Sequence, residues 1–438
     1  MIVRKPKVCK PANAPTVPTA APQRSKPTAA PSRSKPNVRL GGLDVEFRAK
    51  VGESLWCVAR APSGLLAAAT AEGVVVFVDG ARGAIRARSE ATGEPPNAMA
   101  FTGDSRFLLC CADDGCARAL DAANGGVIFE HTVAEEPVAG KRPRVVAADH
   151  CIALADALVA AAGRLIHACA VPSGTLEHAL SADAPVRALR GAAPGAAPGW
   201  AYAAAYTGGV LLVSRGGEIV RELQSERPLR SLATSERWLA AAAFDGTVEL
   251  WENVAEPAAS PGGGAGHQLQ AHCGSDAEAL CWSADGGGLA LSGKSAAVFD
   301  FTGANPPHPY RRAAGARGEP DPLPRVCMDD KHARWVAWAP HSEPRGAATT
   351  LATASSDGTV RVWQPRGTPL RKGGKGDPAQ PERMKPQFYT FLKRDAAHPS
   401  GDAVGVSALV WLGEEVVAVG YETGDIVAWR LGGAAEEE

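Results

Sequence analysis

A glycine turn between two short apolar strands recurs along the chain, and this recurrence constrains the fold more than any other feature. The clearest copy, residues 349–363, reads TTLATASSDGTVRVW. Its two alternating runs meet at Asp357-Gly358, the pattern of a β-hairpin whose glycine takes a positive φ. One hairpin cannot bury its own apolar face, so it requires neighbours. Equivalent turns are marked by Gly73, Gly115, Gly163, Gly208, Gly246, Gly293, Gly358 and Gly424.

The spacing of these glycines indicates one repeat architecture rather than several unrelated domains. Successive positions differ by 42, 48, 45, 38, 47, 65 and 66 residues. A strand of small residues precedes each turn, another strand precedes that one, and a more polar strand often follows the hairpin. Four short strands with a period in the mid-forties predict the blades of a β-propeller. We expect an all-β fold, a single closed propeller over residues 43–431, and we favour eight four-stranded blades over seven.

The two ends of the repeat region complement each other. Residues 43–49 alternate in polarity and precede the first inner strand without a partner of their own, whereas the last repeat ends one strand short at Leu431. We therefore expect residues 43–49 to supply the outer strand of the last blade. Such closure removes exposed strand edges, which favour aggregation.

Segments rich in proline, in glycine or in one charge flank and interrupt the repeats. Residues 1–40 contain nine Lys or Arg, many prolines and no acidic residue, which predicts a disordered basic tail. This composition is compatible with a spacer, a nuclear signal or an organelle transit peptide. We expect a cytoplasmic or nuclear location, with organelle targeting as the alternative. Loops are expected at 254–268, 302–328 and 364–386, and an acidic tail at 432–438.

The overall composition argues against several functional classes. The 46 Lys and Arg nearly balance the 47 Asp and Glu, so the whole chain carries no field that would attract nucleic acid or a membrane. No apolar run reaches the roughly 18 residues that cross a bilayer. The ten cysteines lie mostly in strand-like runs, which predicts small buried hydrophobes rather than a disulfide framework.

Three of the turns carry residues that resemble the WD-repeat β-propeller family. They read FDGTVELWE (244–252), SDGTVRVWQ (356–364) and ETGDIVAWR (422–430), with Trp251, Trp363 and Trp429 at the family's Trp position. Ala271-His272 stands where the family normally has Gly-His, and no repeat shows the full set of Gly-His, turn Asp and Trp. The resemblance extends over residues 43–431. It implies a propeller that serves as a platform for other proteins.

No strong catalytic motif is present. The sequence has no Gly-x-Ser-x-Gly elbow, no His-Glu-x-x-His zinc helix and no Cys-x-x-Cys pair. The stretch RKGGKGDP (371–378) lacks the spacing of a phosphate-binding loop. Adjacent His-Cys pairs such as His150-Cys151 point to opposite faces of a strand, which is poor geometry for chelation. We predict no enzyme activity, no cofactor and no metal.

The heads of the inner strands form the candidate partner-binding site. Aligned on the Leu or Val of their cores, these strands place one residue each at an equivalent position, which in a propeller rings the mouth of the central channel. Arginine dominates there and predicts an electropositive mouth for carboxylate or phosphate groups. Alternatively, each arginine only pairs with an acid of the next blade. The candidates are Trp56, Asn97, Arg187, Arg230, Glu278, Arg334, Ser407 and, when the third repeat is aligned on Val146, Arg144.

These features predict a non-catalytic interaction scaffold that binds other proteins, in particular their acidic or phosphorylated segments, around the channel. One alternative is a non-catalytic subunit of an RNA- or chromatin-modifying complex, in which only the basic tail contacts nucleic acid. Another is a propeller hydrolase, which would need histidines and carboxylates facing the channel, where the aligned positions offer only Glu278. We expect no membrane association and no small-molecule substrate.

Overall fold

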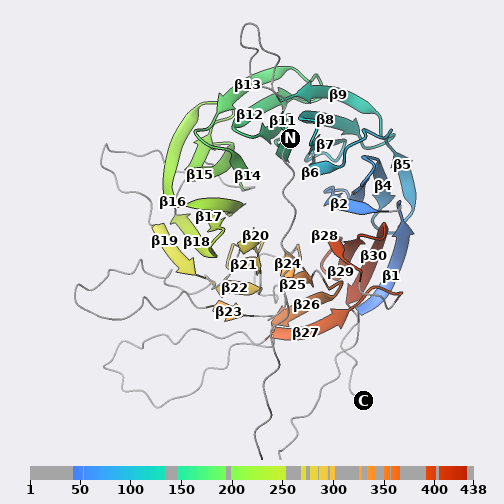
Figure 1. The fold of residues 1–438 in the computed structure, drawn as a ribbon. Coiled ribbons are helices and arrows are strands. Elements are labelled where there is room, and N and C mark those ends of the chain that lie inside the picture. Colours follow the sequence, from blue (N-terminus) through green and yellow to red (C-terminus); the bar gives the residue numbers. More distant parts are fainter. Residues whose placement is uncertain are drawn as a thin grey trace, which may run out of the picture. The chain divides into compact units, whose positions relative to one another are not determined.

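The computed structural model of the protein is built from strands and turns, in agreement with the all-β prediction (Figure 1). The described residues belong to one compact unit, residues 40–438. Among them no helix could span a bilayer. The structure describes residues 43–52, 54–133, 146–193, 199–252, 268–272, 277–284, 286–293, 296–300, 325–327, 333–340, 350–355, 357–365, 391–400 and 404–431.

The described strands form six hydrogen-bonded sheets around a ring, and four of these sheets have four strands each. The first contains β2 (Leu55–Arg60), β3 (Leu65–Thr70), β4 (Val75–Asp79) and β5 (Ile85–Arg88). The second contains β6 (Pro96–Phe101), β7 (Phe107–Ala112), β8 (Cys116–Asp121) and β9 (Val127–Thr132). The third contains β10 (Ala148–Ala153), β11 (Ala157–Ala162), β12 (Leu165–Ala170) and β13 (Leu176–Ser181). The last contains β28 (Val406–Trp411), β29 (Val416–Tyr421), β30 (Asp425–Leu431) and β1 (Leu43–Lys50).

The other two sheets are larger. One has six strands: β14 (Val186–Gly191), β15 (Tyr202–Val213), β16 (Ile219–Thr234), β17 (Trp238–Ala243), β18 (Thr247–Glu252) and β19 (Gln268–His272). The other has eight: β20 (Ala277–Trp282), β21 (Gly288–Gly293), β22 (Ala297–Asp300), β23 (Arg325–Cys327), β24 (Ala333–Trp338), β25 (Leu351–Ser355), β26 (Val360–Pro365) and β27 (Phe391–Ala396).

The expectation of eight separate four-stranded blades, and its alternative of seven, is therefore wrong: the described strands form six sheets, and none closes on itself. Two pairs of neighbouring repeats share hydrogen bonds. Strand β16 pairs with β15 through its first half and with β17 through its second, because the shortest repeat spacing, from Gly208 to Gly246, leaves no loop between them. Strand β21 pairs with β24 at Gly293 and Ala333, two small residues. Periodicity in the sequence contains no signal for such sharing.

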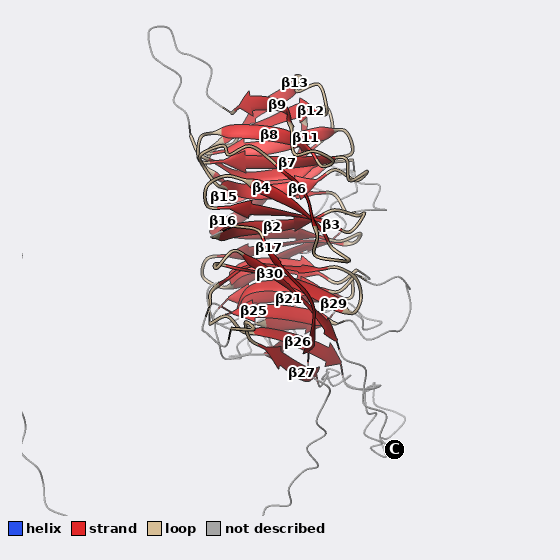
Figure 2. Cartoon of the chain, turned by 90° about the vertical axis from the view of Figure 1, so that its right-hand side faces the viewer, coloured by secondary structure: helices blue, strands red, loops and turns tan. Residues whose placement is uncertain are grey.

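The innermost strands contact one another in a continuous cycle around the ring axis. The order is β2, β6, β10, β14, β16, β20, β24, β28 and back to β2. The core lies between neighbouring sheets, where Leu250 of β18 packs in one cluster with Leu280 of β20. Seen from the side, the turns gather on two opposite faces of the ring (Figure 2). Each face is thus made of turns and strand ends, while the strands form the wall between them.

The expected loops overlap short pieces of strand, which corrects their boundaries. Gln268 begins β19, Arg325–Cys327 form β23, and Gln364 and Pro365 end β26, with Pro365 paired to Phe391. β19 and β23 are the outermost strands of their repeats and need a partner on one side only, and a proline at a strand end costs little ladder bonding. The rest of those loops, together with segments 1–40 and 432–438, lies outside the described residues.

The N-terminal strand β1 joins the two ends of the ring, which confirms the prediction for residues 43–49. It pairs antiparallel with β30, from Leu43 opposite Leu431 to Lys50 opposite Asp425. The Arg48 Nε donates a 3.0 Å hydrogen bond to Oδ1 of the buried Asp425. Although burial opposes it, hydrogen bonds from Arg48 and Thr423 hold the pKa of the Asp425 carboxyl below its usual range.

A buried histidine supports the same junction. The Nε2 atom of His398 lies 3.5 Å from Oδ2 of Asp425, and its ring contacts Tyr421 edge-on, with 4.7 Å between the centroids. The search for Gly-His in the sequence missed this residue because His398 follows β27 in an Ala-His-Pro context. The last sheet therefore has a His-Asp pair that the family motif alone did not reveal.

The described cysteines are free thiols, most of them buried. Cys110, Cys111 and Cys169 are buried within β7 and β12, and Cys57 and Cys281 are half-buried. Burial raises the pKa of the Cys110 thiol to about 12, so this side chain is a neutral thiol at physiological pH. These positions agree with the prediction of small buried hydrophobes.

Histidines also line the seam between the second and third sheets. The Nε2 atom of His131 on β9 lies 2.9 Å from Nδ1 of His167 on β12. Burial lowers the pKa of both imidazoles, and that of His167 falls to about 4, with repulsion from His131 and His178 adding to the effect. Protonation of both rings would place two positive charges about one hydrogen-bond length apart.

Removal of β1 is expected to destabilise the fold. Deleting residues 1–50 removes the β30 partner and the apolar contacts of Phe47 and Ala49. Such a loss is worth about 4 kcal/mol and lowers the melting temperature of a unit of this length by about 5 °C. Differential scanning calorimetry of this deletion, with a deletion of residues 1–42 as the control, measures the contribution of β1. Equal melting temperatures for the two deletions would contradict the closing role of β1.

Acid is expected to weaken the His131–His167 seam. Unfolded His167 binds its proton near pH 6.5 and folded His167 only near pH 4, so the stabilisation is complete above pH 6.5 and is lost as the pH falls toward 4. Between pH 7 and pH 5 this contributes a loss of about 1–2 kcal/mol, allowing for solvent screening. Urea unfolding at a series of pH values measures the slope. The prediction fails if His167→Gln leaves that slope unchanged.

Candidate functional site

A β-bulge near the start of every inner strand defines the candidate site. In β2 the pairing with β3 shifts between Leu55 and Cys57, which leaves Trp56 outside the ladder. A bulge leaves one residue unpaired and turns its side chain in a new direction. The same shift recurs in all eight inner strands, at Trp56, Asn97, Asp149, Arg187, Arg230, Glu278, Arg334 and Ser407. We call these residues the bulge ring.

Seven members of the bulge ring are residues predicted from the sequence, and the third sheet differs. There the shift falls between Ala148 and His150, so the equivalent residue is Asp149. Arg144 lies outside the described residues. The alignment on Val146 chose the wrong core residue, because β10 begins at Ala148 and its buried core is formed by Cys151 and Ile152. The structural equivalence is thus observed, and the binding role of the ring stays a prediction.

The ring residues differ in exposure. The Trp56 side chain is 51% exposed, a large value for tryptophan in a strand. Arg187, Arg334 and Asp149 are also exposed, whereas Ser407 is buried. The remaining members, Asn97, Arg230 and Glu278, are half-buried. The ring therefore combines side chains that can reach a partner with others that support the face.

Arg187 and Asp149 influence each other across the junction of the third and fourth repeats. Although Asp149 as a whole is exposed, partial desolvation of its carboxyl and the charge of Asp113 raise the pKa of this group, while the positive charge of Arg187 opposes the rise. Burial and the same arginine lower the pKa of the His150 imidazole to about 4. His150 is therefore neutral at physiological pH, and this sector of the ring has nearly balanced charge.

Two arginines of the ring stack on aromatic side chains. The Arg230 guanidinium carbon lies 5.3 Å from the centroid of Phe244, a ring that is 42% exposed. The Arg334 guanidinium carbon lies 5.9 Å from the centroid of Trp335. Stacking orders the long arginine side chains and leaves their N–H groups available. Sequence reasoning missed Phe244 because it considered strand heads and not the turn that follows β17.

The turn between β7 and β8 contacts the ring at Asn97. The Nδ2 group of Asn97 donates a 2.7 Å hydrogen bond to Oδ1 of Asp113 and a 3.2 Å bond to the Ala148 carbonyl. Asn97 thereby links the second sheet to the third. Its amide is engaged within the protein, so Asn97 supports the face more than it offers a binding group.

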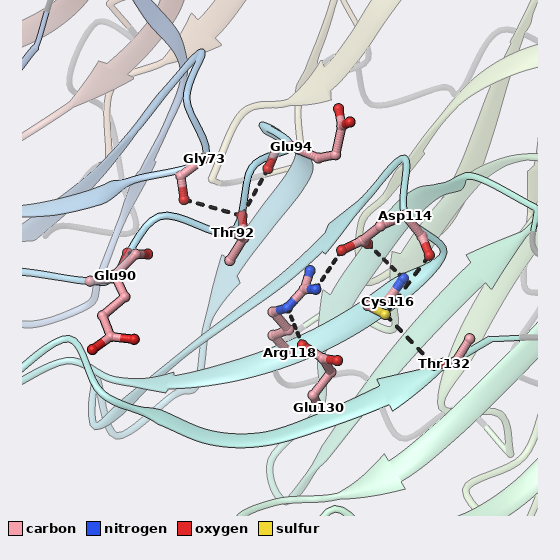
Figure 3. Close-up of polar contacts among 10 residues, drawn as sticks. Gly73, Glu90, Thr92, Glu94, Asp114, Cys116, Arg118, Glu130 and Thr132 are labelled. Atoms are coloured by element: carbon pink, nitrogen blue, oxygen red, sulfur yellow. Dashed lines mark hydrogen bonds and ion pairs between the residues drawn. The ribbon is translucent and has the colours of Figure 1, made fainter.

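A buried arginine holds this turn in place (Figure 3). Arg118 on β8 pairs with Asp114 of the turn, and its Nε atom donates a 2.6 Å hydrogen bond to Oε2 of Glu130 on β9. Asp114 also accepts a 2.9 Å bond from the backbone N–H of Cys116. Two carboxylates compensate the buried guanidinium, whose pKa is raised by them. The neighbouring Asp113 is thus positioned toward Asn97.

The described ring is less positive than the sequence predicted. It contains three arginines and two carboxylates, Asp149 and Glu278, instead of four arginines and one glutamate. The charge of Arg187 acts on the carboxyl of Asp149. At this one position the structure therefore agrees with the alternative prediction, in which each arginine pairs with an acid of the next blade. The sector formed by β16, β20 and β24 carries Arg230 and Arg334 with one carboxylate between them, Glu278, so its ring side chains have a net positive charge.

Metal ligands do not gather in the part of the chain that the structure describes, where no three His, Cys, Asp or Glu side chains could hold an ion together. The ring combines cationic, anionic, aromatic, amide and hydroxyl side chains placed on strands. Such an arrangement can bind extended segments through hydrogen bonds, ion pairs and stacking.

Comparisons with known proteins agree with the propeller fold. The family model described as "WD domain, G-beta repeat" matches residues 331–364, the stretch that contains β24, β25 and most of β26. The chain is similar in fold to the computationally designed Ika8 protein, with a TM-score of 0.62 and 15% identity over 89% of this chain and 100% of that chain. No curated protein matches the sequence.

Replacing Arg187 by alanine is expected to raise the pKa values of both Asp149 and His150. The positive charge of Arg187 lowers both values, so its removal shifts both upward. NMR titration of the carboxyl and imidazole carbons measures the two shifts. Arg334→Ala, which removes an arginine from another sector, is the control and should leave both values in place. Unmoved values in Arg187→Ala would show that these three side chains do not face one another.

Proposed function

Because the chain is a WD-repeat β-propeller, we propose that it is a non-catalytic scaffold that binds segments of other proteins on the face carrying the bulge ring. The family resemblance and the propeller fold support a role in protein interaction. The bulge ring supports the choice of face, because an irregularity repeated in every inner strand presents one side chain per repeat in an equivalent place.

The chemistry of the ring favours acidic or phosphorylated partner segments. The stacked guanidinium groups of Arg230 and Arg334 are ordered, and Arg recognises carboxylate or phosphate with two parallel hydrogen bonds. The exposed Trp56 adds an aromatic contact of the kind that anchors interfaces. We place the main contacts in the sector with Arg230 and Arg334, since the charge of Arg187 is offset by Asp149.

Of the three predicted functions, the described residues support the interaction scaffold. The nucleic-acid alternative depends on the segment 1–40, which lies outside the described residues, and it stays a prediction. The hydrolase alternative stays a prediction as well. Salt-dependent RNA binding that disappears on removal of residues 1–40 would favour the former.

Changing Arg187, Arg230 and Arg334 together to alanine is expected to reduce the amount of partner protein recovered at least about tenfold. Each substitution removes a charged contact from the proposed face. Affinity purification with quantitative mass spectrometry measures the recovery. A triple alanine variant of Arg82, Arg106 and Arg221, which lie outside the bulge ring, is the matched control. Unchanged partners at an unchanged melting temperature would refute the proposal.

A further inference from the structure

A second polar site lies at the other end of β2, away from the bulge ring. Trp56 is near the start of this strand and Arg60 is its last residue, so the two lie about 13 Å apart along the strand. Arg60 lines a pocket of about 540 Å³. We call it the closure pocket, because its walls come from the first and the last sheets of the ring.

Three connections form the closure pocket. The β2–β3 turn contributes Ser63 and Gly64, the β4–β5 turn contributes Gly80, and the β28–β29 turn contributes Leu412. The first two turns touch through their backbones, since a Cβ atom at Gly80 would stand 2.1 Å from the Gly64 carbonyl oxygen. The two turns are therefore packed backbone against backbone at these glycines, and no side chain of Gly64 or Gly80 fills the pocket.

The charges within the pocket do not balance. Arg86 forms an ion pair with Asp79, which also accepts a 2.9 Å hydrogen bond from the backbone N–H of Ala81. These bonds lower the pKa of the Asp79 carboxyl, so it is ionised and fully engaged. The second guanidinium, that of Arg60, has no carboxylate partner among the described residues.

Arg60 is held in place and yet incompletely bonded. Its Nη2 atom donates a 3.2 Å hydrogen bond to the Leu412 carbonyl, while its Nε atom is buried and has no hydrogen-bond partner among the described residues. A buried N–H without a partner costs free energy, and a desolvated cation costs more. An anion placed against the Arg60 guanidinium in the pocket would compensate its desolvated charge.

The surroundings favour a carboxylate on a protein segment over a free anion. One unpaired guanidinium matches one carboxylate, and a single charged hydrogen bond contributes only about 10- to 100-fold in affinity. A lone ion would therefore bind weakly. The apolar side chains of Leu65, Pro62 and Leu412 line the same pocket and can contact the rest of a segment.

We propose that the closure pocket binds an acidic side chain of a partner protein, with Arg60 as its counter-ion. The site is distinct from the bulge ring, because it lies at the opposite ends of the strands and draws on other turns. Since its walls come from the first and last sheets, an occupant contacts both sides of the junction that β1 and β30 complete. The protein thus has two separate sites for acidic groups, one at each end of β2.

The test follows the Nε–H NMR signal of Arg60 in the full chain, assigned by its absence from Arg60→Gln and, independently, from Arg60→Lys. The probe is N-acetyl-glutamate amide, and its neutral match is N-acetyl-glutamine amide. We expect a saturable shift of the Arg60 signal with the first probe, about tenfold weaker or absent with the second. The signal of Arg106, an exposed arginine in the equivalent turn of the second sheet, is the internal control and should not saturate.

Three results would overturn the proposal. They are no saturable shift at Arg60, equal shifts with the two amides, or tighter binding of inorganic phosphate than of the glutamate probe. The triple variant of Arg187, Arg230 and Arg334 should leave the Arg60 titration unchanged. Failure at the closure pocket is therefore distinguishable from failure at the bulge ring.

Discussion

The structure depends on the cycle of contacts among its eight inner strands, and on the one ladder that completes it. Each sheet buries its faces against its neighbours, so a gap at any point would expose two apolar faces at once. Strand β1, from the start of the described residues, pairs with β30 from their end. Asp425 lies at this ladder, accepts a hydrogen bond from Arg48 of β1 and lies 3.5 Å from Nε2 of His398, so it brings together side chains that are far apart in the sequence.

The same architecture gives each repeat a fixed place to present one side chain. The bulge in every inner strand releases a residue from the ladder at the same end, so chemistry at that end can vary without disturbing the core. Arg118, paired with Asp114 and Glu130, illustrates the support this requires, since it fixes the turn whose Asp113 contacts Asn97. At the opposite end of β2 the arginine is bonded differently. Arg60 donates one hydrogen bond to the Leu412 carbonyl, and its Nε–H has no partner among the described residues.

The two faces therefore differ in how their arginines are compensated. Arg187 is balanced by Asp149, while Arg230 and Arg334 rest on aromatic rings. Arg86 is engaged by Asp79, and Arg60 is left without a carboxylate among the described residues.

The sequence by itself determined the all-β propeller, the pairing of residues 43–49 with the last strand and seven of the eight bulge positions, because glycine turns and alternating strands are local signals. It missed three residues. Asp149 is identified by the bulge in β10, Phe244 by its contact with Arg230, and His398 by its distance to Asp425, and each of these is visible only in the folded chain. The tertiary structure alone decided that β16 joins two repeats and that Arg60 has no carboxylate partner among the described residues. Backbone sharing and charge balance arise between segments distant in the chain, so no periodic pattern encodes them.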